Sequence, residues 1–205
     1  MLIVKSKYKI AKRLGAAVFE KTQSNKFALS EARSKGTKRP KRGGGSDFGK
    51  QLLEKQKVRF TYGLSERQLS NYAAAAFEEK DPTLALHKAL EMRADNAAYK
   101  AGFASTRRAG RQMVSHGHIT INGKRITTPS YRLKKGDVLG VREGSRKSTL
   151  FANLAEEKAG NSARAIPAWI APDYSLLTAE VKGEPVYNSV EAGLDYATVF
   201  EFYSR

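Results

Sequence analysis

The stretch LEMRADNAAYKAGFASTRRAGRQMVSHGHITINGKRI, Leu90–Ile126, predicts a dense run of secondary structure at the middle of the chain. Glycine ends helices because it readily adopts the left-handed conformation, so we expect a first helix to stop at Gly102. A Ser-Thr pair soon afterwards can cap a second helix, which we expect to stop at Gly117. Asn122-Gly123 is a strong signal for a two-residue hairpin turn. The predicted order is therefore helix, turn, helix, hairpin.

The sequence before this stretch predicts a small helical module. Ser46, or the aspartate after it, can cap a helix that ends before Gly63. The sequence SERQ then forms a capping box, with Leu64 and Leu69 as the hydrophobic staple around it. A later Asp-Pro pair supplies another N-cap with a first-turn proline, so a further helix is expected there.

The sequence after the hairpin predicts further strands. The sequence KKGD, Lys134–Asp137, is typical of a turn in a strand pair, with Val138 and Val141 available for burial. IPAWIAPDY and the alternating segment ATVFEFY are expected to be strands or extended core pieces around Trp169, Phe200 and Phe202. A mixed domain of sheet and helix should therefore follow the helical module.

The composition of the chain favours a polyanionic partner. Of its 205 residues, 40% are apolar, which is enough to bury a core. The 37 Lys and Arg outnumber the 20 Asp and Glu, and a net charge of +17 indicates nucleic acid. Residues 1–50 and 101–150 carry net charges of +11 and +9, whereas residues 51–100 carry +1 and residues 151–205 carry −4. Two basic blocks suggest two contact surfaces on one large ligand.

The residue types also narrow the location of the protein. With no cysteine, the chain has no disulfide, thiolate metal site or cysteine nucleophile, which suits a reducing compartment. No apolar run approaches the roughly 18 residues of a membrane span, and the N-terminus lacks the charge order of a secretory signal. We therefore expect a cytoplasmic location.

The segment SKGTKRPKRGGGSDF, Ser34–Phe48, has almost no apolar residues and is expected to be extended until it meets its partner. Gly44–Gln51 has the glycine and lysine spacing of a phosphate-binding loop. Gln51 nevertheless occupies the position of the magnesium-binding Ser or Thr, and no buried strand precedes the loop. This stretch is therefore interpreted as a basic linker that runs into a helix, rather than as a nucleotide site.

The second predicted helix of the central stretch carries one polar face. Arg107, Arg111 and Ser115 follow one another at i, i+4 spacing, with Arg108 and Gln112 beside them. The face could be merely solvated, but no acid nearby in the sequence pairs with the arginines, and like charges so placed destabilise a bare helix. Guanidinium groups match phosphate oxygens, so contact with RNA phosphate and ribose is the favoured interpretation.

His116 and His118 flank the glycine at the end of that helix. No cysteine or third nearby histidine completes a metal site, so zinc binding and catalysis are disfavoured. A helix C-terminus that favours a cationic side chain and an exposed hairpin that faces an anion account for both residues.

The helix before Gly63 is a second candidate surface, because basic and amide side chains recur along KQLLEKQKVRFTYG. Its apolar residues are expected in the core, whereas Tyr62 could pack there or stack on a base.

The two sequences KQKVRFTYGLSERQLSNY and LEMRADNAAYKAGFASTRRAGRQMVSHGHITINGKRI, in this order, resemble bacterial small-subunit ribosomal protein four, and the C-terminal EFYSR agrees. The resemblance runs from about Ser46 to the end. It implies an α+β fold in which an RNA-binding domain is inserted into a helical domain that the C-terminal residues complete, after a basic extended N-terminal segment. The expected bounds are 1–45 for the extension, 46–90 with about 186–205 for the helical domain, and 91–185 for the RNA-binding domain, with a core unit at 91–153.

The resemblance also implies a function. Members of the family are primary binders of small-subunit ribosomal RNA that nucleate assembly of its 5′ domain, and they have no catalytic activity. They contact the fifth small-subunit ribosomal protein, an interface tied to translational accuracy, and early basic residues line the messenger RNA entry path. By position, those residues are expected among Lys38, Arg39, Lys41 and Arg42. Many relatives carry an N-terminal cysteine cluster that binds a metal, but this chain has none, so neither a metal nor another cofactor is expected.

The complete set of residues expected to bind RNA is Lys38, Arg39, Lys41, Arg42, Lys50, Gln51, Lys55, Lys57, Arg59, Tyr62, Arg67, Arg107, Arg108, Arg111, Gln112, Ser115, His116, His118 and Lys124. One alternative is an RNA-modifying enzyme that shares the helix-turn-helix-hairpin unit. Only about 55 residues follow that unit here, whereas a catalytic domain typically needs about 100 to 150. A DNA-binding architectural protein could share the charge of the chain but not its resemblance to the family.

Overall fold

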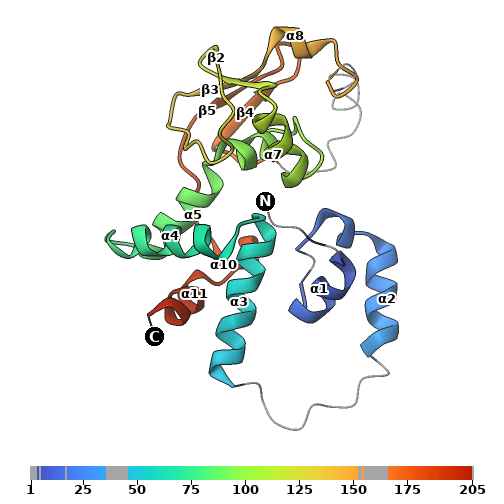
Figure 1. The fold of residues 1–205 in the computed structure, drawn as a ribbon, viewed down its shortest axis with the longest axis vertical. Coiled ribbons are helices and arrows are strands. Elements are labelled where there is room, and N and C mark those ends of the chain that lie inside the picture. Colours follow the sequence, from blue (N-terminus) through green and yellow to red (C-terminus); the bar gives the residue numbers. More distant parts are fainter. Residues whose placement is uncertain are drawn as a thin grey trace. The chain divides into compact units, whose positions relative to one another are not determined.

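A computed structural model describes residues 4, 6–16, 18–35, 46–151, 154 and 166–204. They form helices and one five-stranded antiparallel sheet, which confirms the α+β class. The chain divides into two compact units, the first made of Met1–Leu86 with Asn188–Arg205 and the second of His87–Tyr187 (Figure 1). The second unit is thus inserted into the sequence of the first, and C-terminal residues complete the first.

The first unit is helical. Its elements are α1 (Lys7–Leu14), the 3-10 helix η1 (Glu20–Thr22), α2 (Asn25–Lys35), α3 (Asp47–Thr61), α4 (Glu66–Phe77), α10 (Ser189–Ala192) and α11 (Tyr196–Tyr203). The helix α5 (Pro82–Glu91) joins the two units in sequence.

Predicted caps begin α3 and α4. The Ser46 hydroxyl accepts a hydrogen bond from the Gly49 amide at 3.1 Å and starts α3. Ser65 and Gln68 exchange the two bonds of the capping box at the start of α4. Gly63 lies in the connection between α3 and α4 with a φ of +63°, a conformation that glycine adopts without strain. The helical module was therefore predictable from local sequence.

The predicted extended conformation of residues 1–45 is wrong for α1 and α2. Apolar side chains explain the difference, because Ala11, Phe19 and Phe27 are buried together in a small cluster. Phe60 of α3 packs against this cluster and meets Phe19 edge to face at 6.0 Å. Burial against α3 stabilises helices whose own sequence gives only a weak signal. Most of Ser34–Phe48 lies outside the described residues.

The predicted extended form of ATVFEFY is also wrong, since this sequence is helix α11. Its apolar residues alternate, but Tyr196, Val199 and Phe200 also recur at helical spacing, and all three are buried. Asp195 caps the helix by accepting a hydrogen bond from the Thr198 amide at 3.3 Å. The helix packs on α3 and α4, and this tertiary contact decides between the two periodicities.

The second unit contains α6 (Ala94–Lys100), α7 (Arg107–Ser115), α8 (Glu143–Arg146) and the strands β1 (Ile119–Ile121), β2 (Lys124–Arg125), β3 (Val138–Val141), β4 (Ile170–Asp173) and β5 (Thr178–Val181). All strand pairs are antiparallel, in the order β2-β1-β3-β5-β4. Asn122 and Gly123 have φ values of 50° and 78°, as a tight hairpin turn requires, so the predicted hairpin is confirmed.

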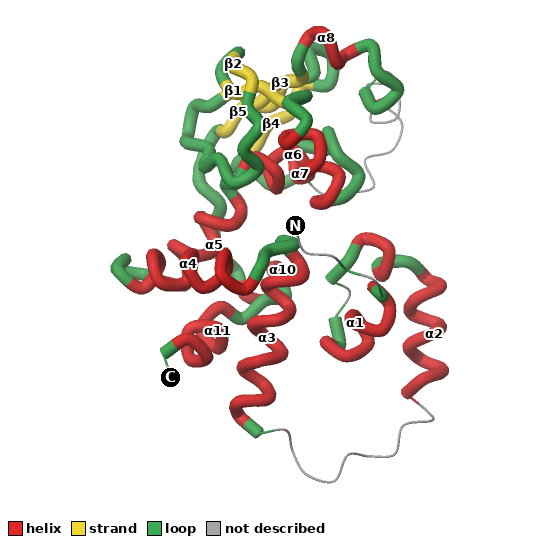
Figure 2. Tube along the Cα trace, in the orientation of Figure 1, coloured by secondary structure: helices red, strands yellow, loops and turns green. Residues whose placement is uncertain are grey.

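Helices α6 and α7 lie beside the sheet of the second unit (Figure 2), and one hydrophobic core joins them to it. Small residues of α6 and side chains such as Val114, Ile119 and Leu139 are buried in one cluster. Val141 and Trp169 are buried as predicted, but Val138 is 40% exposed and that prediction is wrong. Alternate residues of a strand point to opposite faces, so Leu139 and Val141 face the core while Val138 points away from it.

Candidate nucleic-acid interface

Helix α7 has one buried and one exposed face. Thr106 starts it by accepting a hydrogen bond from the Ala109 amide at 3.0 Å. Met113 and Val114 are buried in the core of the second unit. The side chains of the opposite face are exposed, namely those of Arg108, Gln112 and Ser115. Their i, i+4, i+7 spacing forms a stripe that is free to meet a ligand.

Arg107 and Arg111 do not belong to this stripe. The Arg111 Nε lies 3.4 Å from the Asp95 Oδ2, and its side chain is only 15% exposed. The Arg107 Nε donates to the Asn96 Oδ1 at 2.8 Å, and its guanidinium lies 4.6 Å from the centre of the Tyr99 ring. The expectation that no protein carboxylate is available to these arginines is therefore wrong for Arg111. The carboxylate comes from α6, which is distant in sequence but packed against α7.

Asp95 is the centre of a buried polar network. Its carboxylate accepts two hydrogen bonds from Arg93, at 3.0 and 2.7 Å, and one from the Asn96 amide at 2.9 Å. Arg93 is only 1% exposed, so its charge depends on this pairing. A Cβ added to Gly110 would lie 2.5 Å from the Asp95 carbonyl oxygen, which shows how closely α6 and α7 approach. The network therefore fixes the orientation of α7.

The end of α7 is joined to the hairpin and to α8. Gly117 has a φ of +72° and ends the helix as predicted. The Arg125 guanidinium donates to the His116 carbonyl oxygen at 3.2 Å, and a cation there complements the helix dipole. The His118 Nδ1 lies 2.9 Å from the Ser145 Oγ. His118 is half-buried and fastens α8, whereas His116 is exposed and available to a ligand.

The hairpin adds exposed basic residues beside α7. Lys124, which was predicted, and Arg125, which was missed, are both exposed. The signal for Arg125 was present in the sequence as the second half of a basic pair on a short edge strand. Other exposed basic residues that the prediction missed in this unit are Arg132, Lys134, Lys135, Arg142, Arg146, Lys147 and Lys182.

Most of the predicted residues of α3 have partners inside the first unit. Lys57 pairs with Glu54, and Gln51 is buried and donates from its Nε2 to the Glu201 Oε2 at 3.0 Å. Tyr62 is buried with its hydroxyl 3.3 Å from that of Tyr196, which settles its packing in the core.

Lys50 is exposed near Asp47, at 3.2 Å, and Arg67 is exposed on α4. Among the residues of the first unit that were predicted to bind RNA and that the structure describes, only these two are exposed. The early residues Lys38, Arg39, Lys41 and Arg42 lie outside the described residues.

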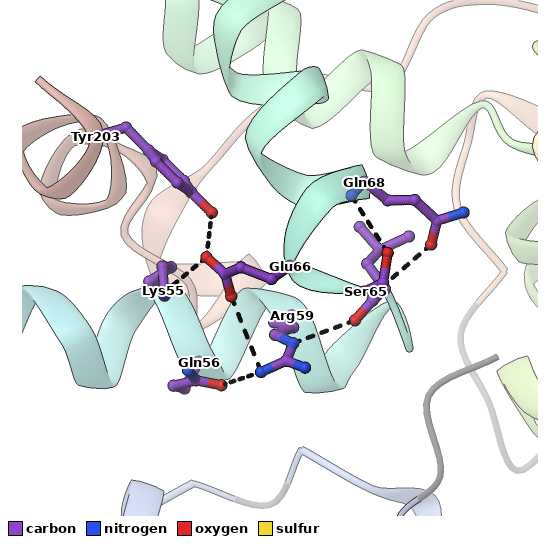
Figure 3. A network of polar contacts seen from close by, with 8 residues as sticks. Lys55, Gln56, Arg59, Ser65, Glu66, Gln68 and Tyr203 are labelled. Atoms are coloured by element: carbon purple, nitrogen blue, oxygen red, sulfur yellow. Dashed lines mark hydrogen bonds and ion pairs between the residues drawn. The ribbon is translucent and has the colours of Figure 1, made fainter.

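Lys55, Arg59, Glu66 and Tyr203 form a cluster that we call the α11 clasp (Figure 3). The Lys55 Nζ lies 2.7 Å from the Glu66 Oε1 and 4.2 Å from the centre of the Phe202 ring. The Tyr203 hydroxyl donates to the same Glu66 oxygen at 3.0 Å, and the Arg59 Nη1 lies 3.8 Å from the Glu66 Oε2. Lys55 is buried here, so it serves the fold of the first unit.

The clasp perturbs its own acid groups. Burial alone would raise the pKa of Glu66, but hydrogen bonds from Lys55 and Tyr203, with the charges of Lys55 and Arg59, hold it below its usual value. Burial and the bond to Glu66 raise the pKa of Tyr203, so the phenol stays protonated and can donate. The hydrogen bonds and ion pairs to Glu66 join α11 to α3 and α4.

Comparisons with known proteins agree with this arrangement. Residues 4–92 match the family model of the ribosomal protein S4/S9 N-terminal domain, and residues 92–139 match that of the S4 domain. The small ribosomal subunit protein uS4 of Acidithiobacillus ferrooxidans is 38% identical over 202 residues, covering 96% of each chain. That of Roseiflexus castenholzii is 40% identical over 200 residues with the same coverage, and that of Limosilactobacillus reuteri is 35% identical over 201 residues, covering 97% of this chain and 96% of the relative.

The chain belongs to the ribosomal protein S4 family. This is a family of structural proteins, so the alternative of an RNA-modifying enzyme is excluded. The S4 domain match contains α6, α7 and the hairpin, with the Asp95 network and the exposed stripe of α7.

Two further observations concern the described part of the chain. Its helices include none with both the length and the apolar character needed to cross a membrane. Among the same residues, no three His, Asp or Glu side chains converge in a group suited to a metal ion.

Proposed function

We propose that the protein is a structural constituent of the small ribosomal subunit that binds small-subunit ribosomal RNA through the second unit. The observation that carries this proposal is the exposed stripe Arg108, Gln112 and Ser115 on a helix whose other polar residues are held by α6. Arg108 takes part in no ion pair within the described residues, so its guanidinium is available to phosphate oxygens. His116 and Lys124 extend the same surface beyond the end of α7.

Family membership supports the identity of the RNA, since the relatives are named as small-subunit proteins. We further propose that binding occurs early in assembly of the 5′ domain, and that the chain contributes to translational accuracy through contact with the fifth small-subunit protein. Lys38, Arg39, Lys41 and Arg42 would line the messenger RNA path. The protein would act in the cytoplasm, within the ribosome.

A titration tests the RNA proposal. The full chain is titrated with a small-subunit ribosomal RNA transcript and with a duplex DNA of equal charge at several salt concentrations. Log affinity for the RNA should fall roughly linearly with log salt, and the DNA should bind much more weakly because its helical shape differs. Equal affinity for the two nucleic acids would refute the proposal.

A further inference from the structure

The segment from Arg142 to Lys147 lies against the end of α7. Strand β1 begins just after α7, and β3 runs antiparallel to it with Ile119 opposite Val141. The chain that leaves β3 therefore passes the junction of α7 and β1. There the Arg142 amide donates to the His118 carbonyl oxygen at 2.8 Å.

A second bond fastens the segment at its centre. The Ser145 side chain is buried, and its Oγ lies 2.9 Å from the His118 Nδ1. The His118 ring lies 6.0 Å from that of His116, which follows the exposed stripe of α7. The segment and the stripe are thus joined through two neighbouring histidines. Basic side chains on such a fixed backbone lose less entropy on binding than they would on a flexible tail.

The exposed side chains of this segment are mainly cationic. Arg142, Arg146 and Lys147 are exposed, and no ion pair among the described residues involves any of them. The Arg146 Nε donates to the Val141 carbonyl oxygen at 3.3 Å, which holds the guanidinium at the surface. Glu143 is the only acid in the segment. Such a concentration of unpaired positive charge fits a polyanion.

We propose that Arg142, Arg146 and Lys147 form a second RNA contact, which binds the phosphate backbone next to the part held by the α7 stripe. This inference rests on the proposed function and extends it to a surface outside the helix and hairpin. Arg125 adds a further cation at the end of α7, because it donates to the His116 carbonyl oxygen. The contacts of His118 with Arg142 and Ser145 hold the segment next to the end of α7, so one RNA backbone could meet both sets of cations. Phosphate oxygens suit it because guanidinium groups bind them in a bidentate manner.

Charge-matched variants test the proposal in the full chain. Arg142→Ala, Arg146→Ala and Lys147→Ala are combined in one triple variant. The control combines Lys134→Ala, Lys135→Ala and Lys182→Ala, which removes three exposed cations elsewhere in the same unit. Lys134 and Lys135 precede β3, at the opposite end of the strand from Arg142.

Ribosomal RNA affinity should fall clearly more for the first triple variant than for the control. The slope of log affinity against log salt should also decrease by about 1 for each lost phosphate contact. Both variants should melt like the parent, since exposed substitutions change stability little. Equal losses in the two variants would overturn the proposal, because charge alone would then explain them.

A position-specific probe gives an independent result. Because the chain has no cysteine, Glu143→Cys creates a single site for a tethered iron chelate that cleaves nearby RNA by hydroxyl radicals. Strong cleavage is expected from this position and little from Lys135→Cys, the control. Absence of cleavage from Glu143→Cys would overturn the proposal and favour an acidic protein surface as the partner.

The two proposals fail in distinguishable ways. If the parent does not prefer ribosomal RNA over duplex DNA, both are refuted. If the parent does prefer it and Arg108→Ala weakens binding, while the triple variant binds like the parent, only the second contact is refuted.

Discussion

The Asp95 side chain holds α7 in its orientation against α6. It is buried between Arg93 and Arg111, and it accepts a hydrogen bond from its own neighbour Asn96. Removing one partner of a buried ion pair is costly because the remaining charge keeps its desolvation penalty without compensation. Sequence spacing suggested that Arg111 contacts RNA, whereas in the structure its guanidinium pairs with this carboxylate. The polar residues of α7 therefore divide between holding the helix and meeting a ligand.

Asp95→Ala should lower the free energy of unfolding by about 3 kcal/mol or more, since it leaves Arg93 buried without its carboxylate. Urea unfolding at neutral pH measures the change. Glu180→Ala, at an exposed acid on β5, is the control and should change stability by no more than about 0.5 kcal/mol. Equal stability of Asp95→Ala and the parent would show that the network does not hold the fold.

Arg108 and Arg111 should separate binding from folding. Arg108→Ala should weaken ribosomal RNA binding with a stability change of no more than about 0.5 kcal/mol, because the side chain is exposed. Arg111→Ala should lower stability by about 1 to 2 kcal/mol, because it removes a partner of a buried carboxylate. Thermal melts and RNA titrations on both variants provide the comparison. The reverse pattern would place Arg111, rather than Arg108, at the RNA surface.

Among the helices, those with local signals were predictable and those that depend on distant contacts were not. The capping box at Ser65 and the hairpin at Asn122 use hydrogen bonds and backbone conformations that a few adjacent residues determine. The helix α11 was mistaken for extended structure, because its short apolar pattern fits two periodicities until α3 and α4 cover it. Helices α1 and α2 were missed for the same reason, since their core includes Phe60 from α3.

The α11 clasp should make stability depend on pH. The folded state lowers the pKa of Glu66, so its contribution is present above the ordinary carboxyl pKa of about 4.3 and is lost as pH falls through the folded value. Glu66→Gln should therefore be about 1 kcal/mol less stable than the parent at pH 7, since the carboxylate is partly exposed. Urea unfolding at several pH values should show this gap closing below about pH 4. A gap that stays constant with pH would exclude the charge of Glu66 as the cause.

The staple of α4 provides a test of its packing. Leu69 is fully buried, and Leu64 beside the capping box is equally buried. Leu69→Ala should cost on the order of 2 kcal/mol or more, because it leaves a cavity in the first unit. Thermal or urea unfolding measures the loss, with Leu53→Ala on the more exposed side of α3 as the control. A loss no greater than that of the control would contradict the assignment of Leu69 to the core.

For the protein as a whole, the net charge of the sequence predicted the chemical class of the partner. It was a poorer guide to which residues are exposed for contact. Residues 101–150 belong to the second unit, and most of their Lys and Arg side chains are exposed. The first unit differs. The side chains of Gln51 and Lys55 in α3, and of Tyr62 just after it, contact residues of α4 or α11, and sequence spacing does not predict these contacts. Long-range pairing therefore removes predicted contacts from the surface.

The central claim, that this chain is a component of the small ribosomal subunit, is tested most directly by sedimentation. A lysate of cells that produce the protein is separated on a sucrose gradient, and the chain is detected with an antibody in each fraction. The account predicts that the chain peaks with small subunits and with complete ribosomes and remains with small subunits after these are dissociated. Recovery of the chain only among free proteins, or only with large subunits, would contradict the account.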